Sequence, residues 1–311
     1  MPLFFPRLTA AAAAIAAAVG LAAPVQAQNG LAGPYLAARH ASQENDYKAA
    51  VAYYTQALAR DPSNPGLLEN ALVAFIGLGQ VDSAVPIARR LQSTGYDSQA
   101  GNLVLLADQL KRGAFDQALE DIEAGRSVGP LVDGLAKAWG HLGAGRMAQA
   151  LETFDATSRE TGLSVFGTYH KALALAMAGD FEGAEALFAS DEGQALHMTR
   201  RGVLAHVEIL SQLERNAEAV ALLTDVFGPE PDPGVAQLRA ELEQGGMLPF
   251  DIVTSAQDGA SEVFFTVAGA LEGEAVDAYT LLYSRTAEFL RPDHVDAVLL
   301  SASLLEAQEN Y

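Results

Sequence analysis

Cysteine is absent from the 311-residue sequence. This excludes disulfide bonds, thiolate metal sites, a cysteine nucleophile and a lipid carried by cysteine at a cleavage site. Aromatic residues are also few, at 7% of the chain, although 50% of all residues are hydrophobic. Regular strand patterning is missing as well. This composition favours helices that approach closely through small side chains over a core of bulky ones.

Basic residues are the second shortage, with 19 lysines and arginines against 39 acidic residues and a net charge of -20 at pH 7. So acidic a surface repels phosphate backbones and anionic lipid head groups, and it lacks the basic face that nucleic-acid binding requires. We therefore expect no nucleic acid among the partners. The acidic surplus has two interpretations: it keeps an alanine-rich array in solution, or it attracts a positively charged partner.

Catalytic and cofactor signatures are missing too. No pair of histidines has the spacing of a zinc hydrolase, and no glycine-rich phosphate loop or nucleophile elbow occurs. The carboxylates are expected on exposed helix faces, where solvation accounts for them. We predict no enzyme activity, no metal and no cofactor. The histidines considered as ligands are His40, His141, His170, His197, His206 and His294.

The N-terminal segment has the features of a signal peptide. Arg7 precedes an apolar run from Leu8 to Ala23, and a small-residue site follows that ends at Ala27. The run is shorter than the roughly 20 residues that span a bilayer, which disfavours the alternative of a membrane anchor. We predict a signal peptide over residues 1–27 and a soluble mature protein, exported to the periplasm of a bacterium, with no membrane insertion after cleavage.

A period of about 34 residues organises the rest of the chain. A small residue returns at intervals of 34, 34, 32, 34 and 35, and a turn residue precedes each copy by five positions. Such a period is the mark of a helix-turn-helix array. The small residues are Ala50, Ala84, Ala118, Ala150, Ala184 and Ala219, and the turn residues are Asn45, Gly79, Gly113, Gly145, Gly179 and Glu214.

The stretch from Asn45 to Pro62 resembles the second helix of a tetratricopeptide repeat (TPR). The family's small, aromatic and proline positions are matched by Ala38, Ala50, Ala57, Tyr54 and Pro62. The resemblance implies an all-α, right-handed α-solenoid of tetratricopeptide helix-turn-helix repeats, interrupted near residues 228–259. Its small residues let paired helices approach until their side chains interdigitate.

We predict an array of about six units over residues 28–227, an irregular connector with one helix over 228–259, and further units over 260–311. The last unit is incomplete, because Glu309 to Tyr311 reads like a turn into a second helix that does not follow. The chain is then the front part of a longer protein. The alternative is a natural end whose uncapped face is covered by a partner or by self-association.

Two local departures leave alternatives open. Pro86 either sits near the start of a second helix capped by Asp82 or kinks that helix. Lys137 and Lys171 lie 34 residues apart where the family usually has an apolar residue. Either the repeat phase shifts by one there, or both side-chain stems lie along apolar surface with their ammonium groups on the groove side.

The resemblance further implies that the first helices line a concave groove that binds a peptide or a helix of a partner protein. The groove residues that it implies are Tyr35, Arg39, Asn70, Val73, Leu103, Trp139, Phe166, Tyr169, His170 and Leu173. Of the family's carboxylate-clamp positions only Asn70 matches, so a chaperone-tail receptor is disfavoured.

We predict a non-catalytic protein-interaction scaffold in the bacterial cell envelope. The alternative is a targeting or accessory arm of a larger envelope enzyme or assembly machine, whose other domains lie beyond Tyr311.

Overall fold

The computed structural model describes residues 30–190 and 192–309, and within these ranges all regular elements are helices. The prediction of an all-helical fold is therefore confirmed. The predicted signal peptide and its cleavage site lie outside the described residues. Within the described part of the chain, no helix combines the length and the hydropathy that crossing a bilayer requires.

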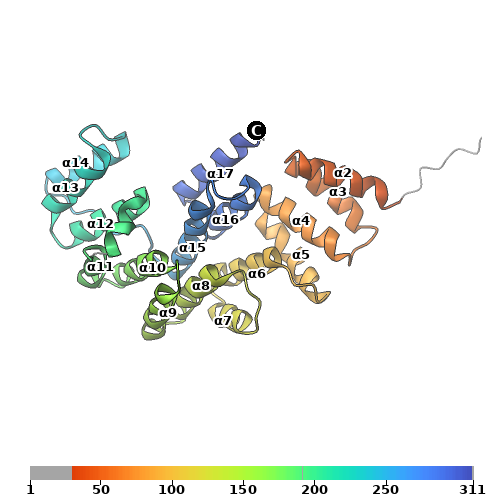
Figure 1. Cartoon of the computed structure of the whole chain (residues 1–311), viewed down its shortest axis with the longest axis horizontal. Coiled ribbons are helices and arrows are strands. Elements are labelled where there is room, and N and C mark those ends of the chain that lie inside the picture. Colours follow the sequence, from red (N-terminus) through yellow and green to blue (C-terminus); the bar gives the residue numbers. More distant parts are fainter. Residues whose placement is uncertain (1–29, 191, 310–311) are drawn as a thin grey trace, which may run out of the picture.

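Six consecutive helix pairs form an array, in which each helix packs against the next (Figure 1). The pairs are α2 (Ala32–Gln43) with α3 (Tyr47–Leu58), α4 (Pro65–Gly77) with α5 (Val81–Ser93), α6 (Gln99–Lys111) with α7 (Phe115–Glu123), α8 (Pro130–Gly143) with α9 (Met147–Arg159), α10 (Ser164–Met177) with α11 (Phe181–Phe188), and α12 (Arg200–Gln212) with α13 (Asn216–Phe227). A 3-10 helix, η1 (Glu192–Met198), lies between α11 and α12.

One left-handed residue joins the two helices of each pair. The six turn residues have φ between 56° and 87°, including the non-glycine residues Asn45 and Glu214. The residue after each turn donates its backbone N–H five positions back, as from Asp46 to the carbonyl oxygen of Ala41 at 2.8 Å. This is the Schellman arrangement, which satisfies the last carbonyl groups of the first helix. The shared turn chemistry explains why the period survives where glycine is replaced.

The six repeating alanines lie where the paired helices meet, and each is at most 1% exposed. Because interiors are close-packed, a larger side chain at such a position costs about 1–3 kcal/mol. The helix starts are fixed locally, since the side chains of Asp46, Asn64, Ser98 and Thr199 accept a backbone N–H of the first turn.

The structure decides the alternatives at Pro86 and at Lys171. Helix α5 runs without interruption through Pro86, and Gln80 rather than Asp82 holds its N-cap position, so capping by Asp82 was a wrong prediction. The Nζ of Lys171 lies 2.6 Å from a carboxylate oxygen of Asp155 on α9. Its ammonium group therefore points to the second helix of the preceding pair and not into a groove.

Three more elements follow the connector helix α14 (Pro233–Glu243): α15 (Ala256–Leu271), α16 (Asp277–Leu290) and α17 (Val295–Ala307). They do not extend the array outward. Helix α15 packs against α6, α8 and α10, and α16 packs against α4, α5 and α6. Figure 1 shows α15 to α17, in blue, on the inner side of the arc formed by the array. The chain thus fills much of its own concave side.

The connector that brings the chain back is fastened to α12 and α13. The amide nitrogen of Leu248 donates to Ser211 Oγ at 2.9 Å, and the side-chain amide of Asn216 donates to the carbonyl oxygen of Gly246 at 2.7 Å. A separate apolar cluster of Val203, Val207, Leu210, Ala219, Leu223, Val235, Leu242 and Leu248 joins α12, α13 and α14. Residues 228–259 are therefore a packed part of the fold.

Candidate binding site between α10, α12 and α15

Most of the groove residues expected from the sequence are covered by the chain itself. Trp139 is buried beneath Gly259 of α15, so closely that a Cβ atom placed on Gly259 would lie 2.3 Å from the indole ring. Leu103 and Leu173 are buried in the same core as α15 and α16. Val73 and Leu103 face Tyr279 and Leu282 of α16 across a small cavity. No partner can reach this part of the groove while α15 and α16 are in place.

His170 is held in a buried chain of hydrogen bonds. Trp139 Nε1 donates to His170 Nδ1 at 3.0 Å, so the other ring nitrogen carries the proton and faces Thr266 Oγ1 at 3.3 Å. Burial lowers the pKa of His170 to about 4, which keeps the ring neutral at pH 7. His170 therefore ties α8 to α15 and has no position left for a ligand.

Three expected groove residues lie apart from the rest, on α2 and α4. Arg39 and Asn70 are exposed, and Tyr35 is half-buried beside the first helix pair. The structure thus divides the expected surface into a covered middle and an open end. Phe166 and Tyr169 of the expected set line a second and larger cavity.

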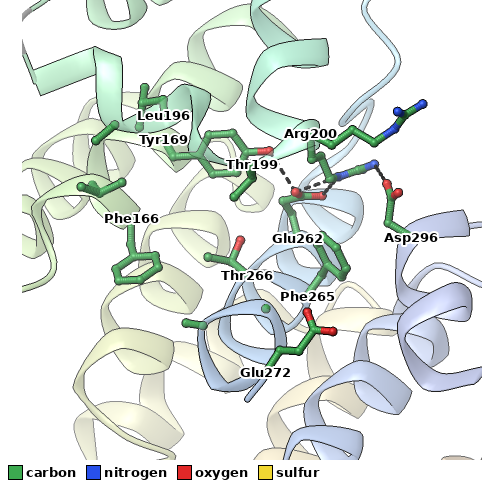
Figure 2. Close-up of a pocket in the computed structure, with 15 residues that line it drawn as sticks. Phe166, Tyr169, Leu196, Thr199, Arg200, Glu262, Phe265, Thr266, Glu272 and Asp296 are labelled. Carbon is green, nitrogen blue, oxygen red and sulfur yellow. Dashed lines mark hydrogen bonds and ion pairs between the residues drawn. The ribbon is translucent and has the colours of Figure 1, made fainter. Parts of the chain in front are cut away.

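That cavity has a volume of about 410 Å³ and lies between α10, the start of α12 and α15 (Figure 2). Its walls are mainly apolar and include Val165, Phe166, Leu196 and Phe265, and Gly269 and Ala270 also line it. A volume of roughly 300–1,000 Å³ with apolar walls and a few polar groups is typical of ligand pockets. Figure 2 shows Phe166 and Phe265 on opposite sides of Thr266.

A buried ion-pair cluster closes the polar end of the cavity. Glu262 on α15 is 1% exposed and accepts hydrogen bonds from the Tyr169 hydroxyl at 3.0 Å and from Arg201 Nε at 2.7 Å. His294 Nδ1 accepts the N–H of Ala297, so its Nε2 carries a proton and donates to Glu262 at 3.2 Å. Four segments far apart in the chain meet at this carboxylate.

Arg201 carries the charge that makes this burial possible. It binds Asp296 at 2.8 Å and the carbonyl oxygen of Ile252 at 3.2 Å besides Glu262. Burial by itself would raise the pKa of Glu262, but the Arg201 charge and the His294 hydrogen bond outweigh it and lower the pKa to about 2. Burial and the Glu262 charge hold the pKa of Tyr169 well above its usual value. Both groups keep one protonation state near neutral pH, as a structural cluster does.

Sequence reasoning missed Glu262, Arg201 and Phe265. The expectation that the carboxylates lie on exposed helix faces was wrong for Glu262 and for Glu208, which are both buried. Glu208 accepts the N–H of Asp251 at 3.0 Å, and burial raises its pKa to about 8. The sequence offers one sign that Glu208 and Glu262 are buried. With a period of 3.6 residues, each glutamate falls in the apolar stripe of its helix, α12 or α15.

His141, His197 and His206 each have a side-chain partner: Arg146 Nε donates to His141 Nδ1 at 3.3 Å, and the other two pair with each other. No group of three or more histidine, aspartate and glutamate side chains suited to a metal ion occurs among the described residues. His197 and His206 lie side by side, with 2.8 Å between their ring nitrogens, and both stack against Phe188. This cluster packs η1 against α11 and α12.

Consecutive helix pairs with a common turn and a common small contact residue define a helical repeat protein. The family model described as "Tetratricopeptide repeat" matches residues 41–105, which run from the end of α2 into α6. This stretch of the chain therefore matches the tetratricopeptide repeat family. Repeats of this family generally mediate protein–protein interactions and are typically non-catalytic scaffolds.

The crystal structure of the TPR domain of P58(IPK) is among the solved structures similar to this chain. The two chains are 12% identical, and the match covers 90% of this chain and 99% of that domain with a TM-score of 0.29. No curated protein matches the sequence.

Proposed function

We propose that this protein is an exported, non-catalytic interaction module of the bacterial cell envelope, and that it holds a segment of a partner protein in the cavity between α10, α12 and α15. The observation that carries the proposal is the apolar cavity of about 410 Å³, which stays open where the chain fills the middle of its own concave side. The family's general role supports a protein as the partner.

The chemistry of the walls favours an apolar anchor from that partner. Phe166, Leu196 and Phe265 present apolar surface with few competing polar groups. An aromatic or aliphatic side chain that fills such a pocket typically contributes most of the binding energy of an interface. The cluster around Glu262 fixes α10, α12 and α15 relative to one another, so the pocket is formed before the partner arrives, which lowers the entropic cost of binding.

Charge favours a partner segment with basic residues beside its anchor. Glu272 and Asp296 line the cavity, and the chain as a whole has a net charge of -20. Arg200 is already paired with Asp232 and Arg201 with Glu262 and Asp296. A basic segment would be attracted over a long range, and salt would weaken that attraction.

The test combines site-specific crosslinking with a wall variant. Val165 lines the cavity and is exposed, so a photo-crosslinking amino acid is placed at this position. The protein is crosslinked in its native compartment, and the captured partners are identified by mass spectrometry. We expect one partner to be captured through Val165 and lost in Phe166→Ala. Phe181→Ala is the matched control, because that half-buried ring contacts Phe250 outside the cavity.

Two results would contradict the proposal. One is a partner captured equally with and without the Phe166 ring, and the other is no specific crosslink from Val165 in cells that contain the folded protein. Export is tested separately by cell fractionation and by sequencing the mature N-terminus, which we expect to begin at Gln28.

A further inference from the structure

Another large cavity lies on a different face of α10 from the one described above. Its volume is about 560 Å³, and its lining residues lie on α9, on α10 and at or just after the end of α11, three consecutive helices of the array (Figure 1). Helix α10 contributes Ser164, Thr168 and Lys171, which follow the i, i+4, i+7 spacing of one helix face. Phe166 and Tyr169, which line the first cavity, fall outside that spacing. We call the new cavity the polar pocket.

The hydroxyl group of Thr168 is the first sign of a ligand. Thr168 lies within α10 and is only 8% exposed, yet its hydroxyl has no hydrogen-bond partner among the described residues. Five other helical threonines donate to the carbonyl oxygen four residues back, and these are Thr55, Thr153, Thr157, Thr224 and Thr286. A buried hydroxyl without a partner is unfavourable, so the one that lines the polar pocket needs a partner there.

Unused hydrogen-bond donors also come from the other lining residues. Arg159 is exposed and forms no hydrogen bond or ion pair with any described residue, so its guanidinium N–H groups and its charge are available. The hydroxyl of Ser164 likewise has no partner in the described part of the chain. Lys171 donates to Asp155 at 2.6 Å, which uses one of its three N–H groups and leaves two.

Two further serines that line the polar pocket offer no donor. Ser158 Oγ donates to the carbonyl oxygen of Phe154 at 3.0 Å, and Ser190 Oγ donates to that of Leu187 at 2.8 Å. The charges of Lys171 and Asp155 offset each other, so the unpaired charge at the pocket is that of Arg159. A site with a positive charge and a surplus of donors fits a ligand that is rich in acceptor oxygens and negatively charged.

The two helices that carry these donors are in tight contact. A Cβ atom placed on Gly167 of α10 would lie 2.7 Å from the backbone nitrogen of Ser158 on α9. The ion pair of Lys171 with Asp155 joins the same two helices. The packing therefore fixes the backbone that carries Arg159 and Thr168 before a ligand arrives, which lowers the entropic cost of binding.

We propose that the polar pocket binds a small molecule with one phosphoryl group, whose oxygens accept hydrogen bonds from Arg159, Thr168 and Lys171. A phosphoryl group has three acceptor oxygens that point in different directions, which suits donors from two helices better than the two coplanar oxygens of a carboxylate do. Arginine binds phosphate oxygens in pairs. The net charge of -20 repels polyanions such as nucleic acid or an anionic membrane, so the ligand is a small one.

The test is a titration of the full chain with glycerol phosphate and, separately, with inorganic phosphate, followed by phosphorus NMR at constant ionic strength. Arg159→Met removes the unpaired charge, and Thr168→Val removes the hydroxyl while it keeps the branched shape of the side chain. We expect the dissociation constant to rise by about tenfold in each variant, because each loses a hydrogen bond to a charged group. Circular dichroism verifies that both variants stay folded.

Each variant has a matched control. Arg39→Met removes an exposed arginine of α2, far along the chain from the polar pocket, and so measures the effect of one lost charge on its own. Thr153→Val removes a hydroxyl of α9 that donates within its own helix, to the carbonyl oxygen of Gln149. We expect both controls to bind the two phosphate compounds as the parent does.

The two compounds separate the sources of the phosphoryl group. Tighter binding of glycerol phosphate assigns the polar pocket to an organic phosphate ester, and binding of inorganic phosphate at least as tightly assigns it to the free anion. Three results would overturn the proposal: no saturable binding of either compound, equal binding by the parent and by both pocket variants, or acetate that competes as well as phosphate. None of these depends on the first cavity, so the proposed function is tested independently.

Discussion

Helices α8 and α2 are both first helices of a pair, but their inner faces have different neighbours. α8 lies against α15, and its Trp139 is buried under Gly259. On α2 the corresponding side carries exposed Leu36 and Arg39, and no described helix of the C-terminal segment covers them. The position of a residue within the repeat therefore does not by itself make it part of a binding surface. Whether the residue is accessible depends on which element lies opposite it.

The largest effect is expected from breaking the Arg201–Glu262 ion pair on the covered concave side. Arg201→Met leaves Glu262 buried beside Tyr169 without its main positive partner, and removing one member of a buried pair costs about 3–5 kcal/mol. Arg200→Met is the adjacent control, because Arg200 pairs with exposed Asp232 and such pairs contribute about 0–1 kcal/mol. Urea unfolding measures both. Equal losses would show that the cluster does not hold α15 in place.

The second prediction uses pH to sharpen the same contrast. The pKa of Glu262 is lowered to about 2, so its contribution is present above the unfolded value of about 4.5 and is lost as the pH falls toward 2. A shift of this size corresponds to roughly 3 kcal/mol. We expect thermal stability to drop steeply below pH 4.5, and Glu262→Gln to remove most of that dependence. A Gln variant with the same acid profile would contradict the assignment.

Glu208 gives the opposite sign in the same molecule. Burial raises its pKa to about 8, so the stability that comes from its protonated form is present below about pH 4.5 and is lost as the pH rises through 8. We expect Glu208→Gln to flatten the stability curve between pH 4.5 and 8 and to be more stable than the parent at pH 8. Thermal melts between pH 4.5 and 8 measure this. If stability depends on pH equally in the parent and in Glu208→Gln, the raised pKa of Glu208 is wrong.

A smaller effect is expected from the close approach of α15 to α8. Gly259→Val adds a side chain where the indole of Trp139 already lies, and overpacking of this kind costs about 1–3 kcal/mol. Gly269→Ala, on the same helix with open space around it, should be neutral or stabilise by up to about 1 kcal/mol. Denaturant unfolding and Trp139 fluorescence report on both. A harmless valine at position 259 would mean that the two helices are not in contact.

The smallest effect is expected at the open end. Arg39→Ala removes an exposed side chain and should change stability by no more than about 0.5 kcal/mol. A loss comparable to that of Arg201→Met would show that α2 is covered in solution, and the comparison between the two regions would fail.

The turns and contacts of the array could be predicted from the sequence because they are local. The left-handed turn after α2 and the small contact at Ala50 depend on residues within one helix pair, and the same chemistry recurs in each pair. The cavity could not be predicted in the same way. Tyr169 and Glu262 are separated by 93 residues, and Arg201 and Asp296 by 95, so no short-range pattern joins them.

The sequence by itself determined the helix pairs, their period and their turns, because each rests on spacing within about 34 residues and on the φ angles that the turn residues accept. Only the tertiary structure decided where α15 to α17 lie. From the sequence, the apolar faces of α8 and α15 could pack against a partner or against each other. The close contact at Gly259 and the ion pair of Arg201 with Glu262 stabilise the packing of α15 within the chain. The same folding leaves the cavity beside Phe166 open.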